Sequence, residues 1–87
     1  MSEPGTGHNT GFAGARVTVM GLGLHGGGAA TARYLAERGA EVTVTDLREE
    51  HELRESLEQL DDLSCRAVLG RHEEEDFASA DFVVKNP

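Results

Sequence analysis

The chain has 87 residues, which suits one small domain, and a formal net charge of −8, which argues against nucleic acid or an anionic membrane as partner because both are bound through basic patches. Its single cysteine, Cys65, forms no intramolecular disulfide, so we expect a reducing, cytoplasmic compartment. No apolar run is long enough to cross a membrane, and the polar N-terminus lacks the apolar core of a signal peptide.

The first half of the chain predicts a leader, a strand and a helix. Met1–Gly14 is rich in glycine and polar residues, so we expect a flexible leader ahead of one domain at 15–87. The short β-branched run Arg16–Met20 predicts the first strand. A helix is expected from Gly26 or Gly27 to Arg38, because its small residues let it lie close on a sheet although glycine is a poor helix former. Gly39 suits its left-handed cap.

The second half continues the alternation of strands and helices. The expected elements are a strand at Glu41–Asp46, a helix at Arg48–Leu60 with leucines at i, i+4 and i+7, a strand at Arg66–Leu69, a short helix at Glu73–Ala78 and a strand at Asp81–Val84. The order β-α-β-α-β-α-β with short connections predicts an α/β, Rossmann-like, three-layer fold with a parallel sheet. The chain ends at Pro87 without a closing element, so we interpret it as an N-terminal fragment.

The pattern Gly21-x-Gly23-x-x-Gly26 lies between the first predicted strand and the first predicted helix. In that context glycines permit a tight turn, a close approach of the backbone to a diphosphate, and close packing of helix on strand. Asp46 ends the second predicted strand, 20 residues after Gly26. It is expected either to accept hydrogen bonds from a ribose or to cap the next helix, and both roles stay open.

The remaining reactive side chains predict no catalytic centre. Arg48 follows Asp46 closely enough to reach a ligand, although it could also be a solvated side chain in the first turn of the next helix. Among the four histidines only His25 lies in the glycine-rich turn, where it is expected to face a ligand. No histidine pair has metal-ligand spacing, so no metal site is predicted. Cys65 is expected to fill space as a small apolar residue.

Four segments, taken in order, resemble the N-terminal domain of the Mur ligase family, most closely its D-glutamate-adding members. They are Val17–Gly27, Val42–Arg48, Gly70–His72 and Asp81–Pro87, which are similar to the family's G-L-G-x-[ST]-G turn, D-x-R strand ending, G-x-H segment and D-x-V-V-x-S-P-G ending. The likeness covers about 15–87. It implies a Rossmann-like domain that begins a longer ligase of peptidoglycan synthesis.

The resemblance also implies a ligand, the UDP part of UDP-N-acetylmuramoyl-L-alanine. The implied contacts are Gly21, Gly23, Leu24, His25 and Gly26 around the diphosphate, Asp46, Leu47 and Arg48 around the uracil end, and Asn86 with Pro87 at the border of the pocket. The chain departs from the family at His25, where Ser or Thr is usual, and at Asn86, where Ser is usual. These departures leave the exact substrate open.

In the family, the chemistry takes place in other domains. A central domain with a P-loop uses ATP and Mg²⁺ to form an acyl phosphate, and a C-terminal domain delivers the amino acid that attacks it. The resemblance therefore implies that this fragment carries no catalytic residue and no cofactor, and that its partners are the missing domains. Two alternatives are an NAD(P)- or FAD-binding domain of an oxidoreductase and a non-enzymatic module that senses a nucleotide.

Overall fold

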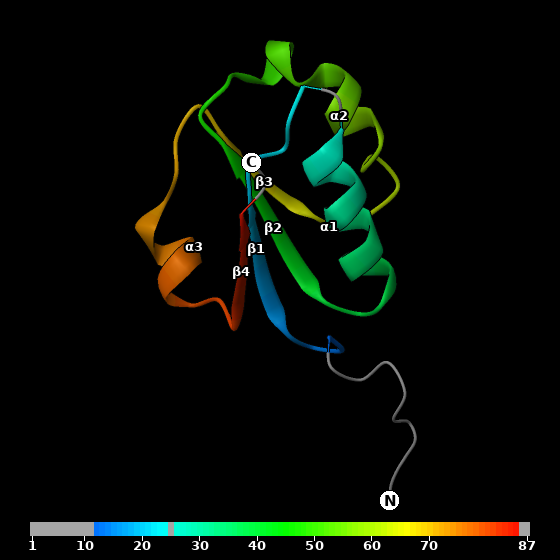
Figure 1. Cartoon of the computed structure of the whole chain (residues 1–87), viewed down its shortest axis with the longest axis vertical. Coiled ribbons are helices and arrows are strands. Elements are labelled where there is room, and N and C mark those ends of the chain that lie inside the picture. The colour runs from blue at the N-terminus through cyan, green and yellow to red at the C-terminus, as the bar shows by residue number, and fades with distance from the viewer. Residues whose placement is uncertain (1–11, 25, 86–87) are drawn as a thin grey trace, which may run out of the picture.

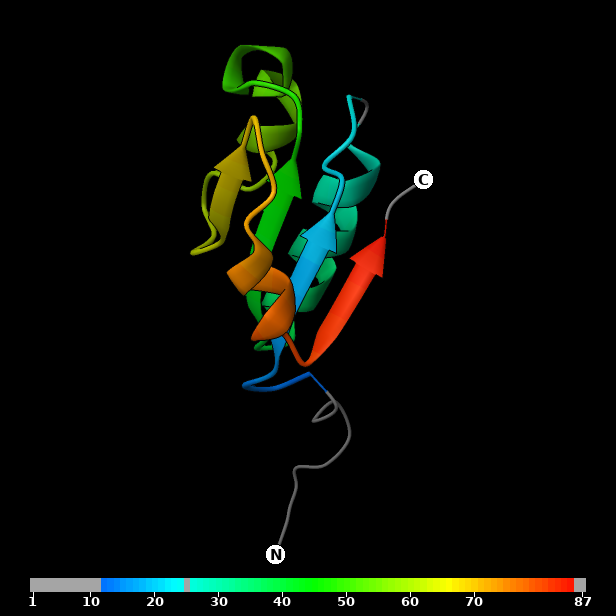
Figure 2. The ribbon, with the colours of Figure 1, turned by 90° about the vertical axis from the view of Figure 1, so that its left-hand side faces the viewer.

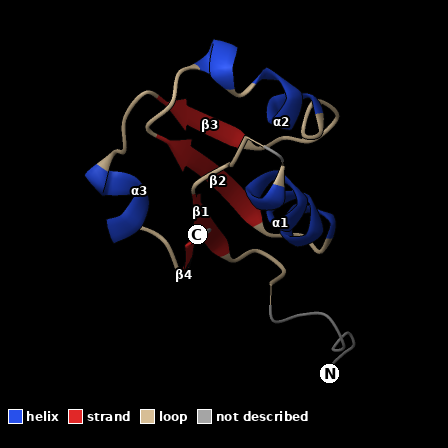
Figure 3. Ribbon diagram, turned by 45° about the horizontal axis from the view of Figure 1, so that its top comes forward, coloured by secondary structure: helices blue, strands red, loops and turns tan. Residues whose placement is uncertain are grey.

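Four parallel strands form one sheet with helices on both faces, as the computed structural model of residues 12–24 and 26–85 describes it (Figure 1). In chain order the elements are β1 (Arg16–Met20), α1 (Gly27–Glu37), β2 (Glu41–Asp46), the 3₁₀ helix η2 (Glu50–Glu52), α2 (Arg54–Glu58), β3 (Arg66–Leu69), α3 (Glu74–Ala78) and β4 (Phe82–Lys85). The strand order is β3-β2-β1-β4. Helices α1 and α2 cover one face and α3 lies on the other (Figures 2 and 3). This arrangement confirms the predicted Rossmann-like α/β fold.

Valine and threonine alternate in β1 and β2, so one face of the sheet carries valines and the other carries threonines. The parallel register pairs Val17 with Val42 and Val19 with Val44, and all four valines are buried towards α1. Thr18 pairs with Thr43 on the opposite face. There the Thr18 hydroxyl donates a hydrogen bond of 2.6 Å to the carbonyl oxygen of Asp76 in α3. The apolar core therefore lies under α1 and α2, whereas α3 is attached partly through polar contacts.

Helix α1 packs closely against the turn that follows β1 because its second residue is a glycine. A Cβ atom added to Gly28 would lie 2.8 Å from the Cα of Leu22 and would also meet the carbonyl oxygen of Gly21. Close packing thus depends on Gly28, whereas the spacing pattern assigned that role to Gly26. At the other end of α1, Gly39 has a φ of 92°, which confirms the predicted left-handed cap.

The predicted strands agree closely with the structure, and one predicted helix is wrong as a continuous element. The first three strands begin and end at the predicted residues, while β4 both begins and ends one residue later than predicted. The stretch predicted as a helix from Arg48 to Leu60 is divided at Leu53, between η2 and α2. It divides because a capping box between Glu49 and Glu52 closes a separate first turn.

The expected leader, Met1–Gly14, lies outside the described residues as far as Gly11. Its last three residues form a turn, in which Phe12 packs against the core and contacts Phe82 edge to face, with ring centroids 6.1 Å apart. Within the part of the chain that the structure describes, every helix is too short to cross a membrane.

Candidate functional site

The glycine-rich turn leaves β1 at the edge of the sheet where the strands end. Gly21, Gly23 and Gly26 have φ values of 100°, 82° and 84°, a region that other residues adopt only with strain. Between them, the side chain of Leu22 is fully buried in the core. The glycines therefore allow a left-handed backbone on both sides of the buried Leu22, and Leu24, after Gly23, is exposed.

Asp46 holds this turn from the end of β2. Its side chain is only 4% exposed, and its Oδ2 accepts hydrogen bonds from the N–H groups of Leu22 at 2.9 Å and Gly23 at 3.4 Å. Its Oδ1 accepts the N–H of Arg48 at 2.9 Å and lies 3.5 Å from the guanidinium of the same residue. A carboxylate has about four acceptor positions, so these four donors occupy the Asp46 side chain fully.

These donors explain the acidity of Asp46. Burial by itself raises the pKa of its carboxyl group, but hydrogen bonds from the N–H groups of Arg48, Leu22 and Gly23, with the charge of Arg48, outweigh it and bring the pKa below the ordinary value of 3.8. The folded turn therefore stabilises the ionised form of the Asp46 carboxyl group.

We expect the turn to loosen in acid as Asp46 takes up a proton. Because the folded pKa is below the unfolded one, the carboxylate stabilises the fold fully above the unfolded value of 3.8, and this contribution is lost as the pH falls through the folded pKa. The amide proton shifts of Leu22, Gly23 and Arg48 should titrate together with a midpoint below 3.8. A shared midpoint above that value would contradict the assignment, and Asp46→Asn should leave these shifts flat.

Ser56 holds the turn from the opposite side. It lies in α2, its side chain is fully buried, and its hydroxyl donates a hydrogen bond to the carbonyl oxygen of Gly23. Nothing in the sequence pattern singles out this serine, because it lies 33 residues beyond the turn in a helix of mostly charged residues.

A cavity of about 520 Å³ opens beside the turn at the carboxyl edge of the sheet. It is lined by Met20, Gly21, Asp46, Leu47, Arg48, Glu52, His72 and Lys85. Met20, Asp46 and Lys85 are the last residues of β1, β2 and β4, so parallel strands bring them together although they are far apart in sequence. Open α/β sheets bind their ligands at this edge.

Charged side chains of both signs line the cavity, and both of its carboxylates accept hydrogen bonds from within the protein. Asp46 is fully occupied as described, and Glu52 Oε1 accepts the N–H of Glu49 at 3.0 Å. Arg48 is 48% exposed and Lys85 is exposed. His72 is fixed by a hydrogen bond of 2.8 Å between its Nδ1 and the Thr45 hydroxyl. The arrangement suits an anionic ligand with polar groups.

The predicted site residues fall into three groups. Gly21, Asp46, Leu47 and Arg48 line the cavity. Gly23, Leu24 and Gly26 belong to the adjoining turn, with Leu24 44% exposed. His25, Asn86 and Pro87 lie outside the described residues, so their expected roles stay predictions.

Sequence reasoning missed Met20, Glu52, His72 and Lys85 as cavity residues. Met20 and Lys85 were identifiable in principle, because each ends a strand of the parallel sheet at the edge where ligands bind. His72 belongs to the G-x-H segment of the family resemblance, but that segment suggested no contact. Cys65, by contrast, packs against the core as expected, and burial raises the pKa of its thiol, which makes it a poor nucleophile.

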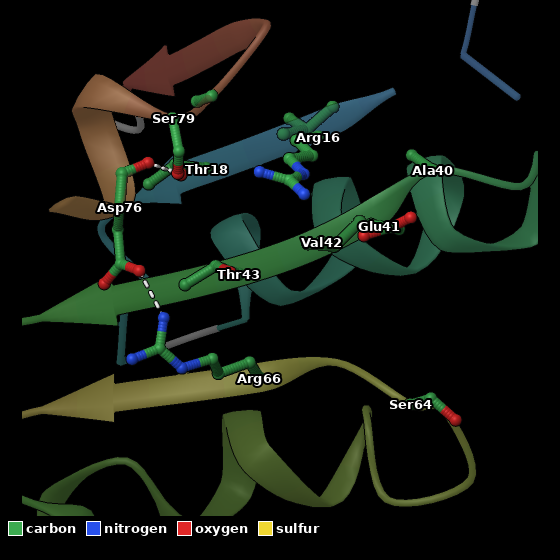
Figure 4. A pocket seen from close by; sticks show the side chains of 12 residues that line it. Arg16, Thr18, Ala40, Glu41, Val42, Thr43, Ser64, Arg66, Asp76 and Ser79 are labelled. Carbon is green, nitrogen blue, oxygen red and sulfur yellow. Dashed lines mark hydrogen bonds and ion pairs between the residues drawn. The ribbon is translucent and has the colours of Figure 1, made fainter. Parts of the chain in front are cut away.

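A second cavity, of about 420 Å³, lies on the α3 face near the starts of the strands. Figure 4 shows Asp76 there, with its carbonyl oxygen on the Thr18 hydroxyl and its carboxylate on the guanidinium of Arg66. None of the predicted site residues lines it. Because it lies away from the glycine-rich turn, we take the cavity at the carboxyl edge as the candidate site.

The fold and site together define a parallel α/β domain with a glycine-rich turn at the carboxyl edge, the arrangement of Rossmann-like domains. Residues 15–87 match the family described as "Mur ligase MurD-like, N-terminal domain". The chain therefore belongs to this family, which confirms the resemblance found in the sequence.

Curated relatives agree with this membership. The chain is 57% identical over 76 residues to a UDP-N-acetylmuramoylalanine--D-glutamate ligase of Roseiflexus sp., an alignment that covers 87% of this chain and 16% of the relative. It is 53% identical over 75 residues to the ligase of the same name from Treponema pallidum, covering 85% of this chain and 14% of that protein. The chain thus spans about one sixth of the length of such relatives.

Proposed function

We propose that this chain is the substrate-binding N-terminal part of a UDP-N-acetylmuramoylalanine--D-glutamate ligase. In this role it binds the UDP part of UDP-N-acetylmuramoyl-L-alanine, to which the complete enzyme joins an amino acid by an amide bond during peptidoglycan synthesis. The observation that carries the proposal is the cavity beside a glycine-rich turn, with Arg48 and Lys85 in its lining, in a chain that belongs to the MurD-like family.

Two parts of the site support the placement of the ligand. The diphosphate would lie against the turn from Gly23 to Gly26, because backbone N–H groups at the start of a helix attract anions. The uracil end would lie over Asp46, Leu47 and Arg48, which line the cavity. Lys85 adds a cation at the end of β4.

The hydrogen bonds of Asp46 favour this reading over an NAD site. An NAD-binding domain needs an acidic side chain at the end of the second strand to accept hydrogen bonds from ribose hydroxyls. Here that side chain is buried and its acceptor positions are occupied by the N–H groups of Leu22, Gly23 and Arg48 and by the Arg48 guanidinium. A ribose would have to displace these donors, which makes the oxidoreductase alternative weaker.

The remaining functions of the proposed enzyme belong to segments beyond this chain. ATP and Mg²⁺ would bind in such segments, which would also supply the catalytic residues. We place the enzyme in the cytoplasm, since the partly buried lone thiol of Cys65 suits a reducing compartment.

The direct test is a titration of the ¹⁵N-labelled chain followed by amide chemical shifts. We expect UDP and UDP-N-acetylmuramoyl-L-alanine to shift the amides of Gly23 to Gly26 and Asp46 to Arg48, and NAD to shift them less. Arg48→Ala should weaken UDP binding roughly tenfold, the loss expected for one charge-assisted contact.

Arg54→Ala is the matched control, because Arg54 is an exposed arginine of the same stretch that lies outside the cavity. It should leave UDP binding unchanged. A preference for NAD at the same amides would overturn the proposal. A second test places residues 15–87 in the Roseiflexus ligase, where the chimera should retain ligase activity and Arg48→Ala should raise the KM for the UDP substrate.

A further inference from the structure

The conformation of Gly23 is held from two sides by side chains that come from different elements. Its N–H donates to Asp46 at the end of β2, and its carbonyl oxygen accepts from Ser56 in α2. These groups belong to the two peptide planes that flank the Gly23 Cα, so fixing both planes fixes the φ of 82°. Glycine is the residue with the most conformational freedom, and here two partly buried hydrogen bonds restrict it.

The contact with Ser56 also sets the direction of the next N–H group. In a trans peptide the carbonyl and the N–H point in opposite directions. Because the Gly23 carbonyl points at the buried Ser56, the N–H of Leu24 points away from α2. Among the described residues no hydrogen bond uses the Leu24 N–H as donor, and the residue is 44% exposed.

We propose that Ser56 and Asp46 are positioning residues that clamp Gly23 and so present the Leu24 N–H to the phosphate groups of the ligand. Without the clamp, the peptide between Gly23 and Leu24 can turn over. Its carbonyl oxygen would then face the ligand and repel an anion. Neither side chain touches the phosphate itself. This inference rests on the proposed function, since it assumes that the turn binds an anion.

The experiment uses the ¹⁵N-labelled chain with two probes, UDP and inorganic pyrophosphate. The variants are Ser56→Ala, Asp46→Asn and the double variant. Ser79→Ala is the control for the first, because the Ser79 hydroxyl also donates to a backbone carbonyl, that of Glu75 at 2.9 Å, in α3. Asp81→Asn is the control for the second, because Asp81 also accepts a backbone N–H, that of Arg16 at 2.9 Å.

We expect Ser56→Ala to raise the dissociation constant of both probes roughly five- to tenfold, as for loss of one hydrogen bond. In the free variant the Leu24 amide signal should broaden or double as the peptide samples two orientations. The double variant should lose clearly less affinity than the product of the two single losses, because both contacts hold the same residue. The Ser79 and Asp81 controls should bind as the unchanged chain does.

Several results would overturn the clamp. If Ser56→Ala binds both probes normally and keeps a sharp Leu24 signal, the clamp is wrong while the proposed function stands. Losses that multiply in the double variant would also reject it. If the unchanged chain binds pyrophosphate but not UDP, the proposed substrate is wrong. The clamp is then still supported if the Ser56 and Asp46 variants bind pyrophosphate more weakly. If it binds neither probe, both proposals fail. Since alanine suits a helix interior, Ser56→Ala remains informative if Asp46→Asn does not fold.

Discussion

Replacing Gly28 with alanine should destabilise the chain strongly and lower the urea concentration at which it unfolds. The added Cβ atom would lie 2.8 Å from the Cα of Leu22 and would also meet the carbonyl oxygen of Gly21, and both neighbours are backbone that cannot rotate away. Overpacking of this kind costs about 1–3 kcal/mol or more, and a domain this small has only about 5 kcal/mol of stability to lose. Circular dichroism during urea denaturation measures the change.

Gly27→Ala is the matched control for that substitution. Gly27 is the exposed first residue of α1, and it lacks the positive φ that would strain alanine. Alanine there should leave stability unchanged or raise it by up to about 1 kcal/mol, because alanine is the better helix former. If Gly28→Ala unfolded at the same urea concentration as the unchanged chain, the inference that α1 packs closely on the turn through Gly28 would be wrong.

Leu22→Ala should produce the second large effect, a loss of about 2–5 kcal/mol in the free energy of unfolding. Leu22 is fully buried, and its side chain anchors the glycine-rich turn to the core. Truncation therefore removes apolar contacts and leaves a cavity directly beneath the candidate site. The same urea titration measures it, and the amide shifts of the turn should change together with stability.

Leu24→Ala is the control for Leu22→Ala, because it tests whether any truncation of a leucine in the turn destabilises the chain. Leu24 lies two residues away in the same turn but is 44% exposed, so its truncation should change stability by less than about 1 kcal/mol. Equal losses in the two variants would contradict the contrast between the buried Leu22 and the exposed Leu24.

Local patterns were sufficient to predict most of the fold. Arg16–Met20 and Glu41–Asp46 were predicted correctly because β-branched residues alternate there and glycine or charged residues bound them. The region from Arg48 to Leu60 was not, because leucines at i, i+4 and i+7 describe a buried face and do not reveal the division at Leu53. That division depends on capping side chains, which the periodicity of apolar residues does not register.

The site was predictable only where its residues are neighbours in sequence. Glycine spacing revealed the turn, and Asp46 and Arg48 were found because Asp46 ends a predicted strand and Arg48 follows it closely. His72, Lys85 and Ser56 are brought to the site by tertiary structure. In the sequence of a polar helix, a serine that is buried cannot be distinguished from one that is exposed to solvent. The roles of His25 and Asn86 remain predictions.

The position of β4 has a consequence for the order of folding. Strand β1 is central, and its pairing with β2 joins residues about 25 positions apart. Its other neighbour is β4, and the contact of Arg16 with Asp81 closes a loop of 65 residues. Closing the longer loop costs more chain entropy and is the slower step. The β1-α1-β2 unit with its glycine-rich turn should therefore assemble early, and the candidate site gains Lys85 only when the last strand joins.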